Sequence, residues 1–115
     1  MIDKVVEYYQ PNVIVLQCGA DSIVHDKLGG FNLSTHGHGD AVKHVLKHNL
    51  PTMLLGGGGY TIENVSRLWT YETSIALGID LDNNLPTRDR YYDYYKNDTK
   101  LHINPKANVE NKNTV

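Results

Sequence analysis

The chain has little cysteine and no long apolar run. Cys18 is the only cysteine among the 115 residues, so no internal disulfide can form, which suits a reducing compartment. The longest uninterrupted apolar run, Val13 to Leu16, is far shorter than the roughly 20 residues that cross a bilayer. The residues after Met1 do not resemble a signal peptide either. We therefore expect no secreted disulfide-bonded domain, no membrane span and no zinc finger.

An excess of one charge is also missing. Lys and Arg total 11 against 13 Asp and Glu, which gives a formal net charge of −2. Such a chain has no general attraction to phosphate backbones or anionic membranes, so we expect no direct nucleic-acid partner and no membrane partner. The hydrophobic content of 40% is enough for a core, and the length fits about one small domain.

The order of apolar segments predicts alternating helices and strands. A helix over 2–9 ends at Gln10 and Pro11, and a second one starts at Ser34 or Thr35 and stops at Asn49. Buried strands are expected at 13–16 and 52–55, and a third helix at 61–77 with Gly78 as its stop. The inward positions are expected to be Ala41, Val42, Val45 and Leu46 in the second helix, and Val65, Leu68, Trp69, Ile75 and Ala76 in the third.

The two apolar strands predict a parallel sheet. A helix joins them, so they should pair in parallel through a right-handed crossover. A parallel sheet needs cover on both faces, and two strands do not make a finished sheet. We therefore expect part of a larger α/β domain.

Chemistry is expected at the carboxyl ends of these strands, where ligands bind in open parallel sheets. Those ends carry residues 18–21 and 56–60, so Asp21 and Tyr60 should face one crevice. An aspartate there can bind a metal, and a tyrosine hydroxyl can donate a hydrogen bond to developing negative charge. The alternatives are a turn or cap role for Asp21 and simple packing for Tyr60.

The four glycines of Gly56–Gly59 indicate positive φ angles or a ligand close to bare backbone. They match neither common nucleotide-binding glycine pattern, and Tyr60 follows them in place of a lysine or serine. Phosphate binding is therefore the weaker interpretation.

The histidines, the cysteine and the clustered tyrosines have structural interpretations. His36 and His38 are two residues apart, so on a helix they would point to different faces, and we expect surface or capping roles. Cys18 is expected to be a small core residue. Tyrosines within 91–95 are expected to pack the tail onto the body. The remaining histidines are expected to be scattered surface or hydrogen-bonded residues: His25, His44, His48 and His102.

Several segments resemble the class I histone deacetylases, in the family's order and over nearly the whole chain. They are LQCGADS at 16–22, LG at 28–29, FNL at 31–33, GH at 37–38, LGGGGYTI at 55–62, Arg67 with WTYET at 69–73, and LHI at 101–103 with Pro105. The resemblance implies an α/β fold of the arginase/deacetylase type, a three-layer αβα arrangement with a parallel sheet. Residues 1–105 would be the C-terminal part of the catalytic domain, and 106–115 an Asn-rich flexible tail.

The activity that the resemblance implies is Zn²⁺-dependent hydrolysis of acetyl-lysine amides, with release of acetate. Asp21 matches the family's second zinc-ligand aspartate. Tyr60 matches the tyrosine that binds the acetyl carbonyl and stabilises the oxyanion. Leu28 matches an apolar residue of the acetyl-lysine channel, and Gly58 and Gly59 match the backbone at its floor. The implied partners are acetylated histone tails or other acetyl-lysine proteins, with a corepressor scaffold, in the nucleus.

The chain also departs from the family pattern. A catalytic zinc needs about three protein ligands, and the family's Asp-x-His motif and adjacent His-His pair are absent from the sequence. We therefore expect a fragment of a longer enzyme that is inactive alone. The alternatives are a catalytically dead short product that binds a partner and, ranked lower, a deacetylase of small molecules of the acetylpolyamine type.

Two further departures concern regulation. Lys27 and Glu63 stand where nuclear class I members usually have arginines that hold an inositol phosphate beside the corepressor scaffold. Lysine keeps a charge without the bidentate fork, and glutamate reverses the charge. We expect regulation through such a scaffold to be weakened.

Overall fold

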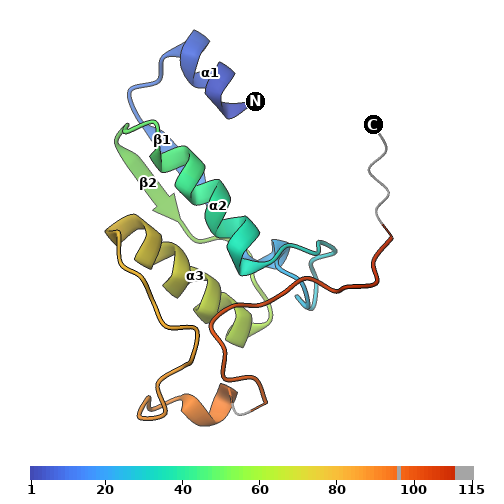
Figure 1. Ribbon diagram of the computed structural model, residues 1–115. Helices are drawn as coiled ribbons and strands as arrows, with labels where there is room; N and C mark the ends of the chain where they lie inside the picture. Colours follow the sequence, from blue (N-terminus) through green and yellow to red (C-terminus); the bar gives the residue numbers. More distant parts are fainter. Residues whose placement is uncertain (96, 111–115) are drawn as a thin grey trace.

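The computed structural model describes residues 1–95 and 97–110 and alternates helices with two strands (Figure 1). No helix within these residues is long and apolar enough to cross a membrane. The elements in chain order are α1 (Ile2–Tyr9), β1 (Ile14–Gln17), the 3-10 turn η1 (Ala20–Ser22), α2 (Thr35–Leu46), β2 (Thr52–Leu55), α3 (Ile62–Leu77) and the 3-10 turn η2 (Tyr92–Tyr95).

Local chemistry explains where the helices begin and end. The Ser34 hydroxyl accepts a hydrogen bond from the Gly37 amide at 3.0 Å, which caps α2 as its sequence predicts. Gln10 and Gly78 adopt the left-handed conformation with φ of 51° and 67°, and they end α1 and α3. The predicted stops at these two residues are confirmed.

The strands β1 and β2 pair in parallel, as predicted, with Ile14 opposite Thr52. Strand β1 begins one residue later than expected. The pairing continues beyond the strands, because the Cys18 amide donates to the Leu55 carbonyl at 2.8 Å and the Ala20 amide donates to the Gly58 carbonyl at 2.7 Å. The loop after β1 is therefore held against the glycine run that follows β2.

The prediction of fully buried strands is wrong for one face of the sheet. Alternate residues of each strand are half-buried, and the others are exposed. Val15 is 60% exposed and Met53 is 55% exposed on the open face. Helices α2 and α3 lie together beside the strands in Figure 1, so the described residues form one sheet with one helical layer. The prediction failed because the apolar character of two strands does not determine whether anything covers the second face of their sheet.

Close packing of α2 against α3 explains one of two wrong inward positions. A Cβ at Gly39 would lie 2.5 Å from a ring carbon of Tyr71 and 2.7 Å from the Ile75 side chain, so the glycine permits the contact. Gly39 and Val42 lie on the buried face of α2, and this turns Ala41 outward. Ala76 on α3 is also exposed. Most of the buried residues of that helix are polar, so apolar character does not identify its inward face. Its buried residues are Asn64, Arg67, Leu68, Glu72 and Ser74.

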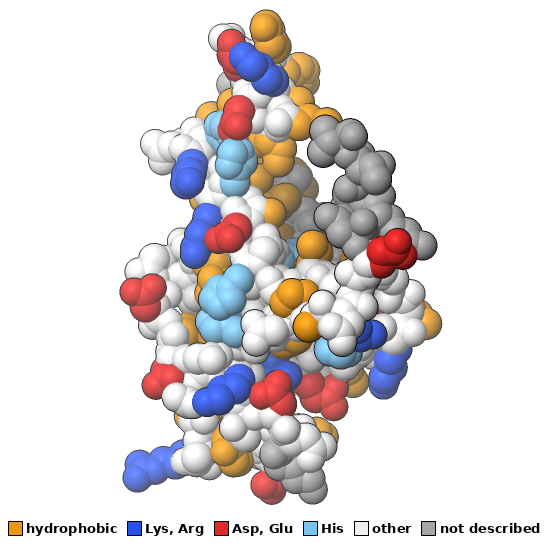
Figure 2. Space-filling view, turned by 45° about the vertical axis from the view of Figure 1, so that its right-hand side comes forward, with side chains coloured by type: hydrophobic (Ala, Val, Ile, Leu, Met, Phe, Trp, Pro, Cys, Tyr) orange, Lys and Arg blue, Asp and Glu red, His pale blue; other side chains and the backbone are white. Residues whose placement is uncertain are grey.

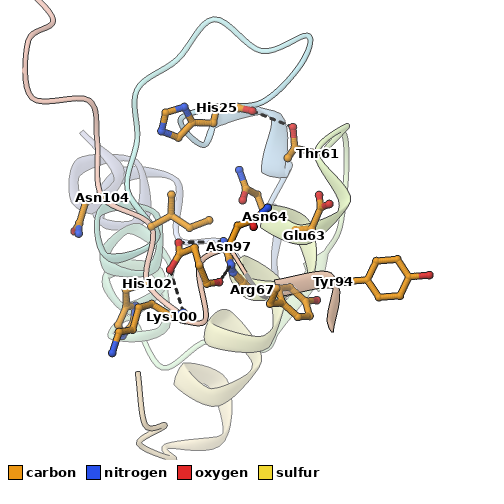
Figure 3. A pocket seen from close by; sticks show the side chains of 13 residues that line it. His25, Thr61, Glu63, Asn64, Arg67, Tyr94, Asn97, Lys100, His102 and Asn104 are labelled. Carbon is orange, nitrogen blue, oxygen red and sulfur yellow. Dashed lines mark hydrogen bonds and ion pairs between the residues drawn. The ribbon is translucent and has the colours of Figure 1, made fainter. Parts of the chain in front are cut away.

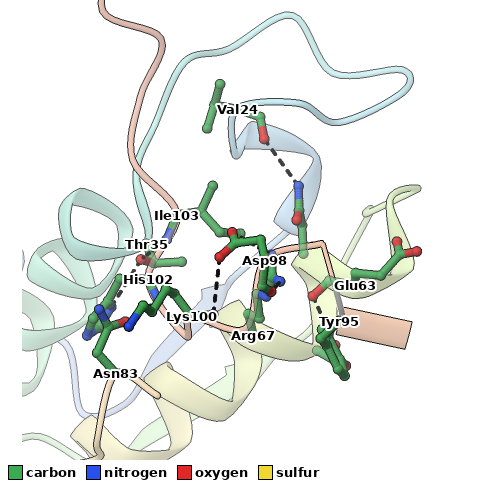
Figure 4. Close-up of polar contacts among 12 residues, drawn as sticks. Val24, Thr35, Glu63, Arg67, Asn83, Tyr95, Asp98, Lys100, His102 and Ile103 are labelled. Carbon is green, nitrogen blue, oxygen red and sulfur yellow. Dashed lines mark hydrogen bonds and ion pairs between the residues drawn. The ribbon is translucent and has the colours of Figure 1, made fainter. Parts of the chain in front are cut away.

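The core includes residues from the C-terminal part of the chain. Ile103 packs with Ile23, Val24 and Leu68 in one buried cluster. Its amide donates to the buried Thr35 hydroxyl at 3.1 Å, and its carbonyl accepts from the Thr35 amide at 3.2 Å (Figure 4). Residues 101–103 therefore belong to the folded body.

Of the 91–95 tyrosines, Tyr95 attaches the C-terminal part of the chain to α3, as predicted. The prediction is wrong for Tyr91 and Tyr94, which are exposed. The Tyr95 hydroxyl lies 2.6 Å from the Ser66 hydroxyl, and the Arg67 guanidinium lies over its ring at 5.2 Å. Arg67 is buried and also binds the Asp98 carbonyl and carboxylate (Figure 4). The expected tail, 106–115, lies partly outside the described residues.

Candidate functional site

Asp21 lies in η1, a few residues beyond the carboxyl end of β1, as the sequence predicts. The residue is half-buried, and its carboxylate lies against the glycine run after β2. A Cβ at Gly58 would lie 2.0 Å from Asp21 Oδ2, which leaves no room for any side chain there. The glycine run thus lets bare backbone approach the carboxylate, and the two loops form one site.

Asp26 holds the loop that carries Leu28 to the loop that carries Tyr60. Its Oδ1 accepts hydrogen bonds from the amides of Leu28 at 2.9 Å and Gly29 at 2.8 Å. Its Oδ2 accepts from the Tyr60 amide at 2.8 Å and the Thr61 amide at 3.3 Å. These backbone donors, Tyr60 first, lower the pKa of the Asp26 carboxyl below its ordinary value. Sequence reasoning missed this residue.

The sequence around Asp26 indicates part of its role. An aspartate that precedes a glycine by three residues is typical of a turn that binds its own backbone amides. The bonds to Tyr60 and Thr61 cross 34 and 35 residues of sequence, so no local pattern indicates them. The consequence is that Tyr60 and Leu28 are positioned by one carboxylate.

Leu28 and Tyr60 both present their side chains at the surface. Tyr60 is 47% exposed, which leaves its ring and hydroxyl accessible to another molecule. Leu28 is more exposed still. Gly59 has a φ of 147°, which side-chain-bearing residues rarely adopt, so a glycine is also required there. Both side chains are therefore available for contact with another molecule.

A buried polar layer lies beneath the Asp21 loop. The His38 ring binds the Glu72 carboxylate through Nδ1, and both side chains are largely shielded from solvent. Glu72, with the backbone carbonyl of Gly19, raises the pKa of His38, although burial opposes the shift. The predicted surface or capping role is therefore wrong for His38, because its partner lies 34 residues away on α3.

Cys18 belongs to the same layer. It is buried as predicted, and desolvation followed by the nearby Glu72 charge raises the pKa of its thiol to about 11. A thiol with so high a pKa is protonated at neutral pH and a poor nucleophile. Its carbonyl accepts a hydrogen bond from the Trp69 indole at 2.8 Å. The interpretation of Cys18 as a core residue is confirmed.

Asp21 has chemistry that suits a metal ion, but it belongs to no group of three metal-ligating side chains among the described residues. Within residues 1–95 and 97–110, the one group of three metal-ligating side chains is Asp3 with His44 and His48. The expectation that these two histidines are scattered is wrong, because both ring nitrogens lie beside one carboxylate oxygen. A zinc ion at Asp21 would need further ligands from outside the described residues.

The cavity in Figure 3 has a volume of about 510 Å³, and Thr61 is among its lining residues whereas Asp21 is not. Glu63 lines this cavity and places a carboxylate there. Arg67, on the next turn of α3, is already paired with Asp98. Lys27 is exposed outside the set of lining residues. The cavity therefore has a mixed character and is not a strongly basic site for a phosphate group.

A family model of the histone deacetylase domain matches residues 1–76 of this chain. Since that is more than half of the chain, the chain belongs to the histone deacetylase domain family. The resemblance found from the motifs of the sequence is thereby confirmed, and so is the α/β fold class.

Curated relatives match almost the whole chain. Histone deacetylase HDAC1 of Drosophila melanogaster is 56% identical over 99% of this chain, which corresponds to 22% of that protein. Histone deacetylase 1 of Homo sapiens is 52% identical over 99% of the chain and 23% of its own length. Histone deacetylase 7 of Arabidopsis thaliana is 55% identical, with 27% of its length covered. The chain thus spans about a quarter of the length of these relatives.

Proposed function

We propose that this chain supplies part of the active site of a zinc-dependent deacetylase that hydrolyses acetyl-lysine amides. The observation that carries the proposal is the half-buried Asp21 carboxylate, which lies against the bare backbone of Gly58 at the carboxyl ends of two parallel strands. Hydrolysis adds water across the amide bond and releases acetate and the lysine amine. Membership in the histone deacetylase domain family supports this reaction.

The roles follow from the position of each residue. Asp21 is proposed as one ligand of the zinc ion, which when bound polarises the acetyl carbonyl and activates water. Tyr60 is proposed to donate its hydroxyl proton in a hydrogen bond to the oxygen that gains negative charge. Leu28 is proposed to contact the apolar stem of the lysine, and Gly58 and Gly59 to form the backbone floor beneath it.

The site needs groups that this chain does not supply. Asp21 is a single ligand where a catalytic zinc takes about three, and Tyr60 donates a hydrogen bond without serving as the general base. We therefore propose that the chain acts within a longer polypeptide, and that the 115-residue chain alone is inactive. The 22–27% coverage of the relatives' own lengths is consistent with this proposal.

Acetylated histone tails or other acetyl-lysine proteins are the proposed substrates, and the nucleus is the proposed location. A corepressor scaffold is a further proposed partner, and an inositol phosphate is proposed to contribute little to its binding. Glu63 supports that qualification, because a carboxylate in the cavity of Figure 3 repels phosphate groups. A deacetylase of small molecules would differ by hydrolysing acetylpolyamines faster than acetylated peptides.

Replacement of the proposed ligand in the full-length protein tests this function. Asp21→Asn should greatly lower zinc content and nearly abolish acetate release from an acetyl-lysine peptide. Asp82→Asn is a matched control, since Asp82 is an exposed aspartate that binds its own turn at Asn84. Unchanged zinc content and activity in Asp21→Asn would remove Asp21 from the metal site.

The second candidate is a short product that binds a partner without catalysis. The open face of the sheet favours it, because Val15 and Met53 expose apolar surface that a partner could cover. Blotting cell extract with an antibody against residues 80–115 separates the two candidates. A band several times heavier than 12.9 kDa supports the deacetylase, and a sole band near 12.9 kDa supports the short product.

A further inference from the structure

Three metal-ligating side chains meet where α1 approaches the end of α2. The Asp3 Oδ1 oxygen lies 2.8 Å from His44 Nε2 and 3.1 Å from His48 Nε2. All three ligand atoms lie within 4.8 Å of one another. Figure 2 shows histidine and acidic side chains adjoining each other at the surface near the end of the molecule that carries α1. Two different elements therefore bring one carboxylate and two imidazoles to one point.

The geometry suits coordination. His44 and His48 are four residues apart, so the last turn of α2 and its continuation place both rings on one side. Ligand atoms about 2.1 Å from a zinc ion in its usual tetrahedral arrangement would lie about 3.4 Å from each other. The two distances to Asp3 Oδ1 are somewhat shorter, so the ligand atoms need to separate only slightly to admit the ion. An ion can enter without a large movement of either helix.

His48 provides an independent indication of a ligand. Its side chain is 17% exposed, and its Nε2 atom is buried without a hydrogen-bond partner among the described residues. The Asp3 oxygen is near enough for an ion pair, but the contact does not have hydrogen-bond geometry. A buried polar atom without a partner is costly, and coordination to a metal would satisfy it. Asp3 is exposed and His44 is half-buried, which leaves room for an ion and its water ligands.

This cluster is distinct from the site around Asp21. Residues 44–48 lead into the amino end of β2, whereas Asp21 follows the carboxyl end of β1. Because the strands are parallel, these ends lie at opposite edges of the sheet. A metal ion at one edge therefore shares no ligand with a metal ion at the other.

We propose that Asp3, His44 and His48 bind a divalent transition-metal ion, Zn²⁺ being the ion that this ligand set suits best. Two imidazoles and a carboxylate are common zinc ligands, whereas Ca²⁺ and Mg²⁺ prefer oxygen ligands alone. Every residue of α1 is exposed or half-buried, so its apolar contacts hold it weakly. The bound ion fastens α1 to α2 and makes the position of α1 depend on metal.

The test is equilibrium dialysis of the full-length protein against buffered free Zn²⁺, followed by measurement of bound zinc. All variants carry Asp21→Asn, so that zinc at the proposed catalytic site is not counted. We expect one zinc per chain in this background and in the His36→Gln control, which removes an exposed histidine at the start of α2. In Asp3→Asn and in the double variant His44→Gln/His48→Gln, zinc affinity should fall by more than about tenfold.

Amide hydrogen exchange supplies a second readout that does not depend on activity. Zn²⁺ should slow exchange in residues 2–9 of the background protein and have no such effect in Asp3→Asn. The Asp3 side chain is 61% exposed, so its replacement carries little risk of misfolding. If the histidine double variant does not fold, Asp3→Asn alone tests whether the cluster binds zinc. Equal zinc affinity in all four proteins, or equal exchange with and without zinc, would overturn the proposal.

Discussion

The loops that follow β1 and β2 differ from the open face of the sheet in whether their side chains have partners within the chain. In the loops, the Asp26 carboxylate alone accepts hydrogen bonds from four backbone amides. On the sheet, apolar side chains such as Val15 and Met53 lie in solvent. Polar groups in the loops thus have hydrogen-bond partners, while apolar groups on the open face of the sheet are not covered by other residues. The chain carries an organised fragment of a site on a sheet that needs further packing partners.

The difference separates two kinds of dependence. The relative positions of Asp21, Gly58 and Tyr60 follow from bonds made within the chain. The stability of the sheet depends on whatever covers its open face. Changes in the loops should therefore alter catalysis in the full-length protein, and changes on the open face should alter solubility and stability.

Among changes that leave the Asp21 and Tyr60 side chains in place, the largest effect on activity and stability together is expected from the closest contact in the loops. Gly58→Ala in the full-length protein would place a methyl group 2.0 Å from Asp21 Oδ2. The carboxylate or the backbone must move, so we expect activity to fall by at least about 10²-fold and the free energy of unfolding to fall by about 1–3 kcal/mol. Steady-state kinetics and denaturant unfolding measure both.

Gly30→Ala is the matched control for this change, because a Cβ at Gly30 meets nothing within 4 Å. It should leave activity and stability unchanged. Equal behaviour of the two alanine variants would mean that the approach of Gly58 to Asp21 has no catalytic importance.

Removal of the Tyr60 hydroxyl should affect the chemical step alone. Tyr60→Phe retains the ring and the backbone bond to Asp26 but loses the donor to the developing oxyanion. We expect kcat to fall by a factor on the order of 10²–10³ with KM nearly unchanged. Tyr94→Phe, at another exposed tyrosine, should retain full activity. A wild-type rate in Tyr60→Phe would reduce Tyr60 to a packing residue.

Loss of the Asp26 charge should have a smaller effect, because the residue acts through its neighbours. Asp26→Asn retains one acceptor oxygen and replaces the other with a donor that cannot accept the amides. We expect kcat to fall by less than about 10²-fold and amide exchange to rise at residues 28, 29, 60 and 61. Unchanged exchange at these positions would contradict the positioning role.

The pH dependence of the Asp26 contribution follows from the lowered pKa of its carboxyl. The ordinary value is 3.8, so the stabilisation is fully present above that pH and is lost as the pH falls through the lower folded value. At neutral pH the carboxylate is therefore fully ionised in wild-type protein.

The smallest expected effect is a change in the pKa of His38, which lies in the buried layer with Glu72. Because Glu72 raises the pKa of His38 above 6.5, the ion pair stabilises the fold most below pH 6.5. That stabilisation is lost as the pH rises through the folded pKa. In Glu72→Gln, an NMR titration should report a lower pKa for His38. Glu7→Gln, at an exposed residue, should leave the pKa unchanged.

Sequence reasoning predicted the parts of the fold that local chemistry determines. The Ser34 cap, the Gly78 stop and the parallel strand pair depend on neighbours in sequence or on one short crossover. The outward orientation of Ala41 and the exposure of Val15 did not follow, because both depend on which surfaces pack together. The apolar character of a residue alone does not show which other surface packs against it.

The same distinction applies to the site. Asp21 could be placed from the rule that parallel strands carry ligands at their carboxyl ends. Glu72 and the part of Asp26 that binds the Tyr60 loop could not, because those partners lie more than 30 residues away in sequence. The metal-ligating cluster of Asp3 with His44 and His48 was missed for the same reason, since it joins α1 to the end of α2.

We propose that this chain holds an organised but incomplete part of a deacetylase site. The most direct test measures acetate release from an acetyl-lysine peptide, with zinc present, by the purified 115-residue chain beside the full-length protein. We expect robust release by the full-length protein and none by the 115-residue chain, which should also be poorly soluble. Zinc-dependent turnover by the short chain at a comparable rate would show that the proposal is wrong.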